Sequence, residues 1–222
     1  MNDNRSAYNS DIYDEHIVNV LPYYKEYHDQ VIDLVRTMGI ENPVWLDTGC
    51  GTGTLAQKAL KLMPQIQFVL CDPSENMLDI AKDKLEGKSI RYHSISSDRL
   101  GFDSEFDVVT AIQSHHYFDE NTREIAVRNC YRALKKSGIF ITFENIRMST
   151  DESDRIALKR WVAFLKEHGN SEEDVKIHLE RRGTTVFPIT IEKHLQLLKK
   201  CGFSSVNLLW SSYLQAGFWA QK

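Results

Sequence analysis

The segment 44–53 constrains the fold most tightly, because it reads Val-Trp-Leu-Asp-Thr-Gly-Cys-Gly-Thr-Gly. Its apolar start is typical of a strand buried in a parallel sheet. The three alternating glycines let the backbone turn sharply and approach a ligand closely. Helical spacing resumes over Thr54–Leu60. We therefore predict a strand, a ligand-binding loop and a helix in succession.

The glycine loop alone leaves the ligand open. A tight turn between a strand and a helix needs no ligand, and 51–56 also fits the G-x-G-x-x-G/A pattern of dinucleotide-binding folds. Asp47, however, precedes Gly49 by two residues and gives the form Asp-x-Gly-x-Gly-x-Gly. This form resembles motif I of the class I S-adenosylmethionine (SAM)-dependent methyltransferases. The resemblance implies that Asp47, Gly49, Cys50 and Gly51 bind this cofactor.

A second motif follows at the next predicted strand, which covers 66–72 and ends at Asp72. Asp72 lies about 20 residues beyond the glycine loop, where a carboxylate can accept both ribose hydroxyls. An acid at this place is also a common strand terminator. The stretch 72–78, Asp-Pro-Ser-Glu-Asn-Met-Leu, resembles the D-x-S-x-x-M-L stretch of small-molecule methyltransferases. By that resemblance Pro73 and Met77 contact the cofactor, with Met77 against the adenine, although its helical spacing suits a core residue equally well.

The third predicted strand, 90–95, is followed by Ser96 and Ser97, where relatives in this family carry Asp-Ala. The serine hydroxyl of Ser96 can accept a hydrogen bond from the adenine. A backbone contact, or Asp98 in a shifted register, would serve as well. We expect Ser96 and Ser97 at the adenine end of the site.

The fourth predicted strand, 106–112, leads to Gln113 and then to a pair of histidines, His115 and His116. Open α/β sheets bind ligands at the carboxyl edge of the strands, so this stretch is expected at the site. We assign Gln113 to the cofactor. His115 and His116 are the candidate general bases for a hydroxyl or amine acceptor, with Tyr117 or Glu144 behind them. The alternative is that one or both histidines only pack in the core.

The N-terminal region, 1–40, is rich in aromatic and polar rings. Residues 1–11 are polar and are expected to be mobile, and helical spacing begins near Ile12 and resumes after Pro22. One interpretation is a helical pair that covers the sheet. The family resemblance favours a lid over the methionine end of the cofactor, with Tyr24 touching that end.

A change of pattern after the fifth predicted strand, 139–144, predicts a helical insertion at 149–187. In the resembled family such an insertion covers the substrate pocket, which is predicted to contain Trp161, Phe164 and His168. Ordinary amphipathic packing explains the same residues. The adjacent cations Arg181 and Arg182 favour an anionic acceptor if they face the pocket.

The C-terminal segments 206–213 and 218–221 are predicted to form an antiparallel hairpin around a 214–217 turn. Such a hairpin distinguishes the methyltransferase fold from a dinucleotide-binding Rossmann domain. The predicted fold is α/β: a Rossmann-like seven-stranded sheet, mostly parallel with a C-terminal antiparallel hairpin, helices on both faces and a helical lid insertion. The chain is predicted to be one domain, 1–222.

Composition limits the partners. A chain of 222 residues with 42% hydrophobic residues can bury one large core, and its net charge of −4 provides no basic field for nucleic acid. The four cysteines are widely spaced, so neither a metal site nor a disulfide framework is expected. No apolar run approaches the roughly 20 residues of a membrane span. We expect a cytoplasmic monomer or homodimer that acts on a small molecule, possibly anionic, away from membranes and nucleic acid.

The predicted function is SAM-dependent methyl transfer to a small-molecule acceptor by in-line displacement, with S-adenosylhomocysteine (SAH) as the product. Two alternatives stay open. Stretches 13–16 and 21–24 resemble carboxy-S-adenosylmethionine synthase, an enzyme of tRNA modification, although an asparagine of that enzyme aligns with Ile112 and its carboxylate-binding arginine has no certain counterpart. The chain could also be a non-catalytic SAM-binding protein.

Overall fold

The computed structural model describes residues 3–7 and 9–222. A single seven-stranded sheet forms its centre, in the order β3-β2-β1-β4-β5-β7-β6. Strands β1 to β5 run parallel, whereas β7 is antiparallel to both of its neighbours, β5 and β6. The strands are β1 Val44–Thr48, β2 Gln67–Cys71, β3 Arg91–His93, β4 Phe106–Ile112, β5 Leu134–Asn145, β6 Ser205–Ser212 and β7 Gln215–Gln221. The predicted fold class is confirmed.

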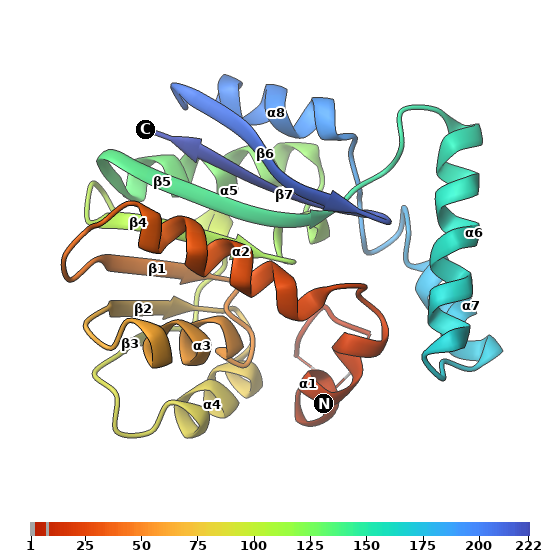
Figure 1. Cartoon of the computed structure of the whole chain (residues 1–222), viewed down its shortest axis with the longest axis horizontal. Coiled ribbons are helices and arrows are strands. Elements are labelled where there is room, and N and C mark those ends of the chain that lie inside the picture. The colour runs from red at the N-terminus through yellow and green to blue at the C-terminus, as the bar shows by residue number, and fades with distance from the viewer. Residues whose placement is uncertain (1–2, 8) are drawn as a thin grey trace.

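The α-helices divide between the two faces of the sheet and the right-hand end in Figure 1. They are α1 Tyr13–His16, α2 Tyr24–Thr37, α3 Thr54–Leu62, α4 Glu75–Lys84, α5 Glu120–Ala133, α6 Asp151–Glu167, α7 Glu172–Glu180 and α8 Ile191–Lys200. Short 3-10 turns are η1 Ser10–Ile12, η2 Ile17–Asn19, η3 Ser97–Arg99 and η4 His115–Tyr117. Helices α2 and α3 lie in front of the sheet, α5 and α8 lie behind it, and α6 and α7 stand apart at its end (Figure 1).

Alternation of side chains along the strands builds two hydrophobic cores. Trp45 packs with α2 and α3 in the front core, whereas the next residue, Leu46, joins α5 and α8 in the rear core. The same alternation holds in β5, where Ile139 and Ile141 face forward and Phe140 faces backward. Helices on both faces therefore fix the sheet, and its carboxyl edge is left for a ligand.

The N-terminal helices serve two different purposes. Helix α2 packs on the sheet through Tyr27, Val31 and Ile32, which are all buried. The shorter elements η1 and α1 lie instead beside α4, at the carboxyl edge of the sheet (Figure 1), and Asp14 of α1 forms an ion pair with Lys84 at the end of α4. Within the region predicted as a lid, α2 is thus a core helix, and α1 lies over the edge.

The C-terminal hairpin differs from its prediction in the position of the turn. Strand β7 begins at Gln215, and the turn falls at Tyr213 and Leu214 instead of at 214–217. Gln215 and Ala216 are buried and pair with Asn145 and Glu144 of β5. Gly217 lies within the strand. Only glycine fits at this position, because an added Cβ would lie 2.4 Å from the Phe143 ring. Close packing, and not turn formation, is the reason for this glycine.

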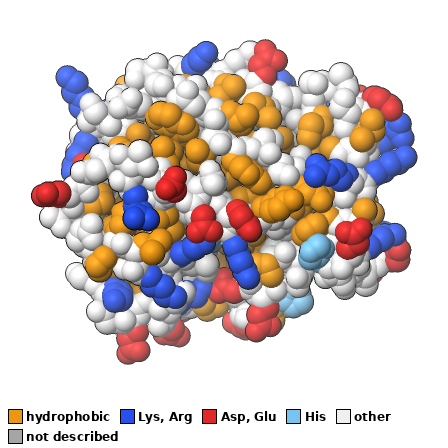
Figure 2. Space-filling model, in the orientation of Figure 1, with side chains coloured by type: hydrophobic (Ala, Val, Ile, Leu, Met, Phe, Trp, Pro, Cys, Tyr) orange, Lys and Arg blue, Asp and Glu red, His pale blue; other side chains and the backbone are white. Residues whose placement is uncertain are grey.

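The surface carries a mixture of charges. Figure 2 shows acidic and basic side chains interspersed over the visible face, with apolar side chains between them. All four cysteines are free thiols. Among the described residues, no helix is both long and apolar enough to cross a bilayer.

Candidate active site

A cavity of about 380 Å³ lies at the carboxyl ends of β1, β2 and β4. Its volume falls within the usual range of roughly 300 to 1,000 Å³ for small-molecule sites. Most residues predicted to bind the cofactor line it, namely Gly49, Gly51, Asp72, Pro73, Met77, Ser96, Ser97 and Gln113. The structure therefore brings together residues from four separate predicted motifs.

Asp72 is held at the tip of β2 by two backbone donors. The N–H of Gly51 donates to Oδ2 and the N–H of Ser74 donates to Oδ1, each at 2.9 Å. Burial raises the pKa of Asp72 to about 6, although both hydrogen bonds act in the opposite direction. The carboxylate thus links the glycine loop to the start of α4, and its position suits acceptance of ribose hydroxyls.

A smaller cavity of about 30 Å³ also adjoins the glycine loop. It is lined by three further residues predicted to bind the cofactor, Tyr24, Asp47 and Cys50. Thr110 Oγ1 donates to Asp47 Oδ1 at 2.7 Å, and the Trp45 indole N–H donates to Thr110 Oγ1 at 2.9 Å. Burial raises the pKa of Asp47 to about 7, against the effect of the Thr110 hydrogen bond. We name this space the methionine-end cavity.

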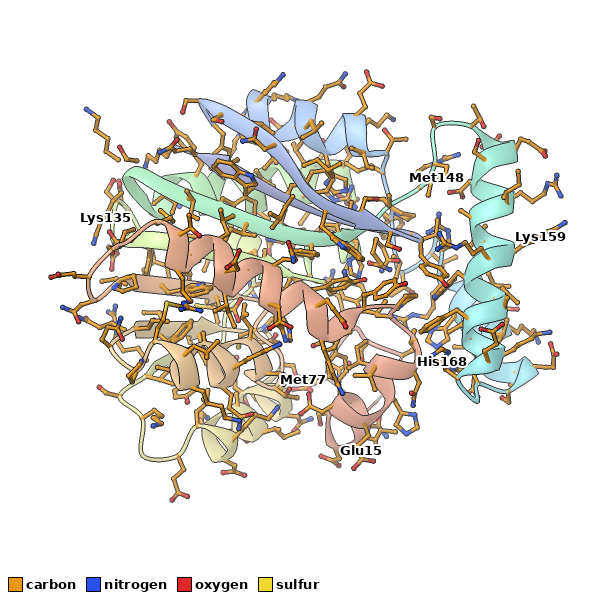
Figure 3. All side chains as sticks on the ribbon, in the orientation of Figure 1. Glu15, Met77, Lys135, Met148, Lys159 and His168 are labelled. Atoms are coloured by element: carbon orange, nitrogen blue, oxygen red, sulfur yellow. The ribbon has the colours of Figure 1, made fainter. Side chains whose placement is uncertain are left out.

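The expected adenine end is lined by Ser96, Ser97 and Asp98. The Ser97 hydroxyl is hydrogen-bonded to Thr48 Oγ1 at 2.8 Å and is buried. Met77 lies on the facing helix α4 (Figure 3), and its backbone N–H is capped by Ser74 Oγ at 3.1 Å. The groups proposed to recognise the adenine, namely the Ser96 hydroxyl, the local backbone and Asp98, therefore all border the cavity.

A third cavity, of about 70 Å³, lies between the sheet edge and the insertion. It shares Ser6, Tyr13, Gln113 and Tyr117 with the 380 Å³ cavity. Its other polar residues are His116, Asn145, His178, Arg181 and Arg182. We name it the acceptor cavity after the acceptor that the sequence predicts beside the cofactor, because it shares residues with the 380 Å³ cavity but does not contain the glycine loop.

His116 lines the acceptor cavity, and Glu144 at the end of β5 holds its ring. Its Nδ1 lies 3.0 Å from Glu144 Oε2, and its backbone N–H donates to the same oxygen at 2.8 Å. Thr142 Oγ1 donates to Oε1 at 2.6 Å. Burial raises the pKa of Glu144, but the hydrogen bond and charge of His116 outweigh it and lower the pKa to about 2. The carboxylate is therefore ionised and fixes the His116 ring.

His115 does not lie in the acceptor cavity, so the structure separates the two histidines that the sequence offered as bases. Its ring stacks against Phe140 in the rear core and lines a cavity of about 10 Å³ with Arg123 and His194. Burial lowers its pKa to about 4. A 3-10 turn points consecutive side chains to different sides, so the sequence pair cannot share one site.

The insertion contributes one of its three predicted pocket residues. Trp161 lines the acceptor cavity and its indole N–H donates to the Val20 carbonyl at 2.9 Å. The rings of Phe164 and His168 stack with their centroids 3.8 Å apart, and Phe164 also packs on Tyr213. His168 is exposed on the turn after α6 (Figure 3). Amphipathic packing therefore accounts for these two residues.

The segment 3–7 lines the site, although the sequence predicted a mobile tail. Asp3 accepts hydrogen bonds from Ser74 Oγ at 2.6 Å and from the Asn76 side chain at 3.0 Å. Arg5 Nη1 donates to the Tyr117 carbonyl at 3.0 Å. Polar residues without periodicity gave no signal for this position, because their partners lie at least 70 residues away in the chain.

These features fit a SAM-sized ligand. The glycines at 49 and 51 have φ values of 70° and 53°, which favour glycine, and their backbone lines two of the cavities. Asp72 and Asp47 offer carboxylates at the two ends of the loop. The chemistry and volume of the cradle therefore suit a nucleoside that carries a cationic amino acid.

Comparisons with known proteins agree with this geometry. Residues 46–138 match the family described as "Methyltransferase domain". The curated carboxy-S-adenosyl-L-methionine synthase of Nautilia profundicola is 24% identical over 205 residues, which cover 91% of this chain and 88% of that protein.

Solved structures share the fold at low identity. Magnesium protoporphyrin IX methyltransferase of Synechocystis PCC 6803 with bound SAH has a TM-score of 0.65 and 17% identity, covering 92% of this chain and 85% of that chain. A candidate O-methyltransferase of Nostoc punctiforme also has a TM-score of 0.65, with 21% identity over 89% of this chain. This chain spans 56% of the Nostoc protein.

The motifs, the sheet order and the family match agree on one assignment. The Asp-x-Gly-x-Gly-x-Gly loop and Asp72 line one cavity, and the antiparallel β7 closes a sheet that is otherwise parallel. Residues 46–138 match a methyltransferase domain, and the chain has the fold of the class I SAM-dependent methyltransferases.

Proposed function

We propose that this protein transfers the methyl group of SAM to a small, anionic acceptor that carries a hydroxyl or amine, and that His116 removes the acceptor proton. The observation that carries this proposal is the junction between the 380 Å³ cavity and the acceptor cavity, where His116 is held by Glu144. A donor site and a base thus meet at one sheet edge.

The cofactor would be held from both ends of the glycine loop. Asp72 would accept the ribose hydroxyls, Met77 and Ser96 would border the adenine, and Asp47 with Tyr24 would face the amino-acid end. When bound, SAM supplies a methyl group on a cationic sulfur. The protein's own contribution is to align the reactants and exclude water, which accounts for much of the acceleration in transfers of this kind.

His116 has the arrangement of a general base. In the neutral form of the ring, an ionised Glu144 would accept a hydrogen bond from Nδ1–H, which leaves the lone pair on Nε2. The His116 ring borders the acceptor cavity beside Tyr117, with ring centroids 4.4 Å apart. This arrangement supports proton removal from a hydroxyl or amine in that cavity.

The preference for an anion depends on Arg181. Arg182 forms an ion pair with Asp154 at 3.0 Å, which neutralises it. Arg181 instead donates to the carbonyls of Arg5 and Ser6, and no ion pair among the described residues includes it. Its positive charge at the cavity therefore favours an acceptor with a carboxylate or another anionic group.

The proposal can be tested by incubating the protein with SAM and a panel of small hydroxy acids, amino acids and uncharged analogues, while SAH release is measured. We expect turnover with an anionic member and a rate lower by about 100-fold to 10,000-fold in His116→Gln. His168→Gln is the matched control, because His168 is exposed outside the cavities. Equal rates for His116→Gln and wild type with a turned-over acceptor would contradict the role of the base.

A second candidate is an enzyme related to carboxy-S-adenosyl-L-methionine synthase. The named Nautilia relative favours it, as does the unneutralised Arg181 beside the donor cavity, because a carboxylate on the transferred group would find a cation there. Native mass spectrometry of the purified protein separates the candidates. A bound ligand with the mass of SAM or SAH would identify the cofactor that both candidates use, and one heavier by a carboxyl group would favour the second candidate.

A further inference from the structure

Tyr13 lies where the three cavities meet. Of the residues that the structure describes, it alone lines the 380 Å³ cavity, the methionine-end cavity and the acceptor cavity. Tyr24 lines only the methionine-end cavity, and Tyr117 lines only the other two. Tyr13 and Tyr117 both border the donor and acceptor cavities, and Tyr13 alone of the two also reaches the methionine-end cavity.

The next residue along the chain fixes Tyr13 over the glycine loop. Asp14 accepts hydrogen bonds from Thr52 Oγ1 at 2.7 Å and Thr54 Oγ1 at 3.1 Å, and it forms an ion pair with Lys84 at 2.5 Å. Thr52 and Thr54 flank the last glycine of the loop. Helix α1 is therefore attached to the same backbone that borders the donor site.

The side chain of Tyr13 is fixed as well. Its hydroxyl is hydrogen-bonded to that of Tyr24, the first residue of α2. The ring is half-buried and its hydroxyl is bonded, so part of its conformational freedom is already lost in the free protein. Binding of a ligand against this ring needs little further ordering.

If the proposed function holds, on which this inference rests, the cofactor's sulfur must lie near this boundary. Its sugar would be at Asp72 and its amino-acid end at Asp47, while the transferred group would face His116. The sulfur is cationic in SAM and neutral in SAH. An aromatic face attracts a cation, and this attraction is stronger where water is excluded.

We propose that Tyr13 is a positioning residue that distinguishes the cationic donor from the neutral product. Its ring gives SAM a part of the binding energy that SAH does not receive. This difference favours binding of the donor and release of the product. A simple cover over the pocket would instead contribute equally to both ligands, so the ratio of the two affinities distinguishes the two roles.

Calorimetric titrations of the full chain with SAM and with SAH test this inference without an acceptor. In Tyr13→Leu we expect the affinity for SAM relative to SAH to fall roughly two- to thirty-fold. Tyr13→Phe keeps the ring and should hold the ratio within about twofold of wild type. Tyr23→Leu is the control, because Tyr23 is 51% exposed and packs outside the cavities on Trp210.

If Tyr13→Leu weakened SAM and SAH binding equally, or raised the affinity for SAM relative to SAH, the inference would be overturned. Tyr13 would then only cover the pocket. Tyr13→Gln also removes the ring and replaces the leucine variant if the latter fails to fold, with the same expected fall. Failure of the wild-type chain to bind either ligand would instead contradict the proposed function, so the two failures are distinguishable.

Discussion

The ring nitrogen Nδ1 of His116 lies 3.0 Å from Oε2 of Glu144, and both side chains are buried at the end of β5. The same carboxylate accepts the backbone N–H of His115 at 3.3 Å and that of His116 at 2.8 Å. Glu144 therefore positions both the 3-10 turn that carries the histidines and the ring that faces the acceptor cavity.

Glu144→Gln should lower the turnover number of an identified acceptor substrate about 100-fold or more, with little change in SAH affinity. The amide cannot stabilise a positively charged His116 ring, and it need not hold the same tautomer. Steady-state kinetics and SAH titrations measure the two effects. Glu124→Gln, on the surface beside Lys200, is the control. A parallel loss of SAH affinity would show instead that Glu144 mainly supports the fold of the site.

Asp72→Ala should weaken SAH binding by about 2 to 4 kcal/mol, since each of two hydrogen bonds to a charged acceptor contributes about 1.5 to 3 kcal/mol before partial compensation. Calorimetry gives this value directly, and circular dichroism verifies the fold. Asp79→Ala, an exposed acid on the same helix as Met77, should bind SAH like wild type. Unchanged affinity in folded Asp72→Ala would indicate that this acid is only a strand terminator.

SAH affinity should increase as the pH rises through about 6. Burial raises the pKa of Asp72 from 3.8 to about 6, and the ribose hydroxyls bind its ionised form, so protonation at lower pH competes with binding. The limiting slope for this one group is about tenfold per pH unit. Titrations from pH 5 to 8 should show this rise in wild type and a weaker one in Asp72→Asn. An equally steep rise in Asp72→Asn would assign it to another group.

The same raised pKa predicts the stability of the ligand-free protein. The folded state binds the Asp72 proton more tightly than the unfolded chain does, so its favourable contribution is complete below pH 3.8 and disappears as the pH rises through about 6. Asp47 acts in the same direction up to about pH 7. Denaturant unfolding of wild type and Asp72→Asn should converge at low pH and separate at neutral pH, with the variant more stable. Equal stabilities at pH 7 would contradict the raised pKa.

Gly49→Ala should abolish SAH binding and destabilise the fold more than Gly87→Ala. Both glycines have left-handed φ values, 70° and 75°, so alanine is strained at either position. An added Cβ at Gly49 would lie 2.4 Å from Ser114 Cβ, whereas none of the described atoms lies within 4 Å at Gly87. Thermal unfolding and calorimetry of the pair separate backbone strain from this steric clash. Equal losses of stability would contradict the close approach of Gly49 to Ser114.

The sequence predicted the sheet and singled out the residues that line the 380 Å³ cavity, because local patterns determine both. Strand alternation, the glycine loop and the acid at the tip of β2 each occupy a short stretch whose chemistry has few uses. The topology then brings Asp47 and Asp72 to neighbouring cavities without further information. Turn position was less predictable, since Gln215 to Gly217 resemble a turn in composition but lie in a closely packed strand.

The acceptor side could not be predicted in the same detail. His115 and His116 are equivalent in the sequence, and only the 3-10 turn and Glu144 place one at the cavity and the other in the core. The hydrogen bonds of Asp3 and Arg5 join residues that are far apart in the chain, and no local sequence pattern predicts such contacts. The sequence does not distinguish Tyr13 from the other rings of the N-terminal region. Only the packing of the chain shows that it lies where the three cavities meet.

The central claim is that the edge of this sheet binds SAM through the glycine loop and Asp72. Separate isothermal titrations of the purified chain with SAH and with NAD test it most directly. We predict a dissociation constant on the order of micromolar for SAH, corresponding to roughly −8 kcal/mol, and no measurable heat with NAD. Tight binding of NAD without any response to SAH would contradict both the cofactor assignment and the proposed function.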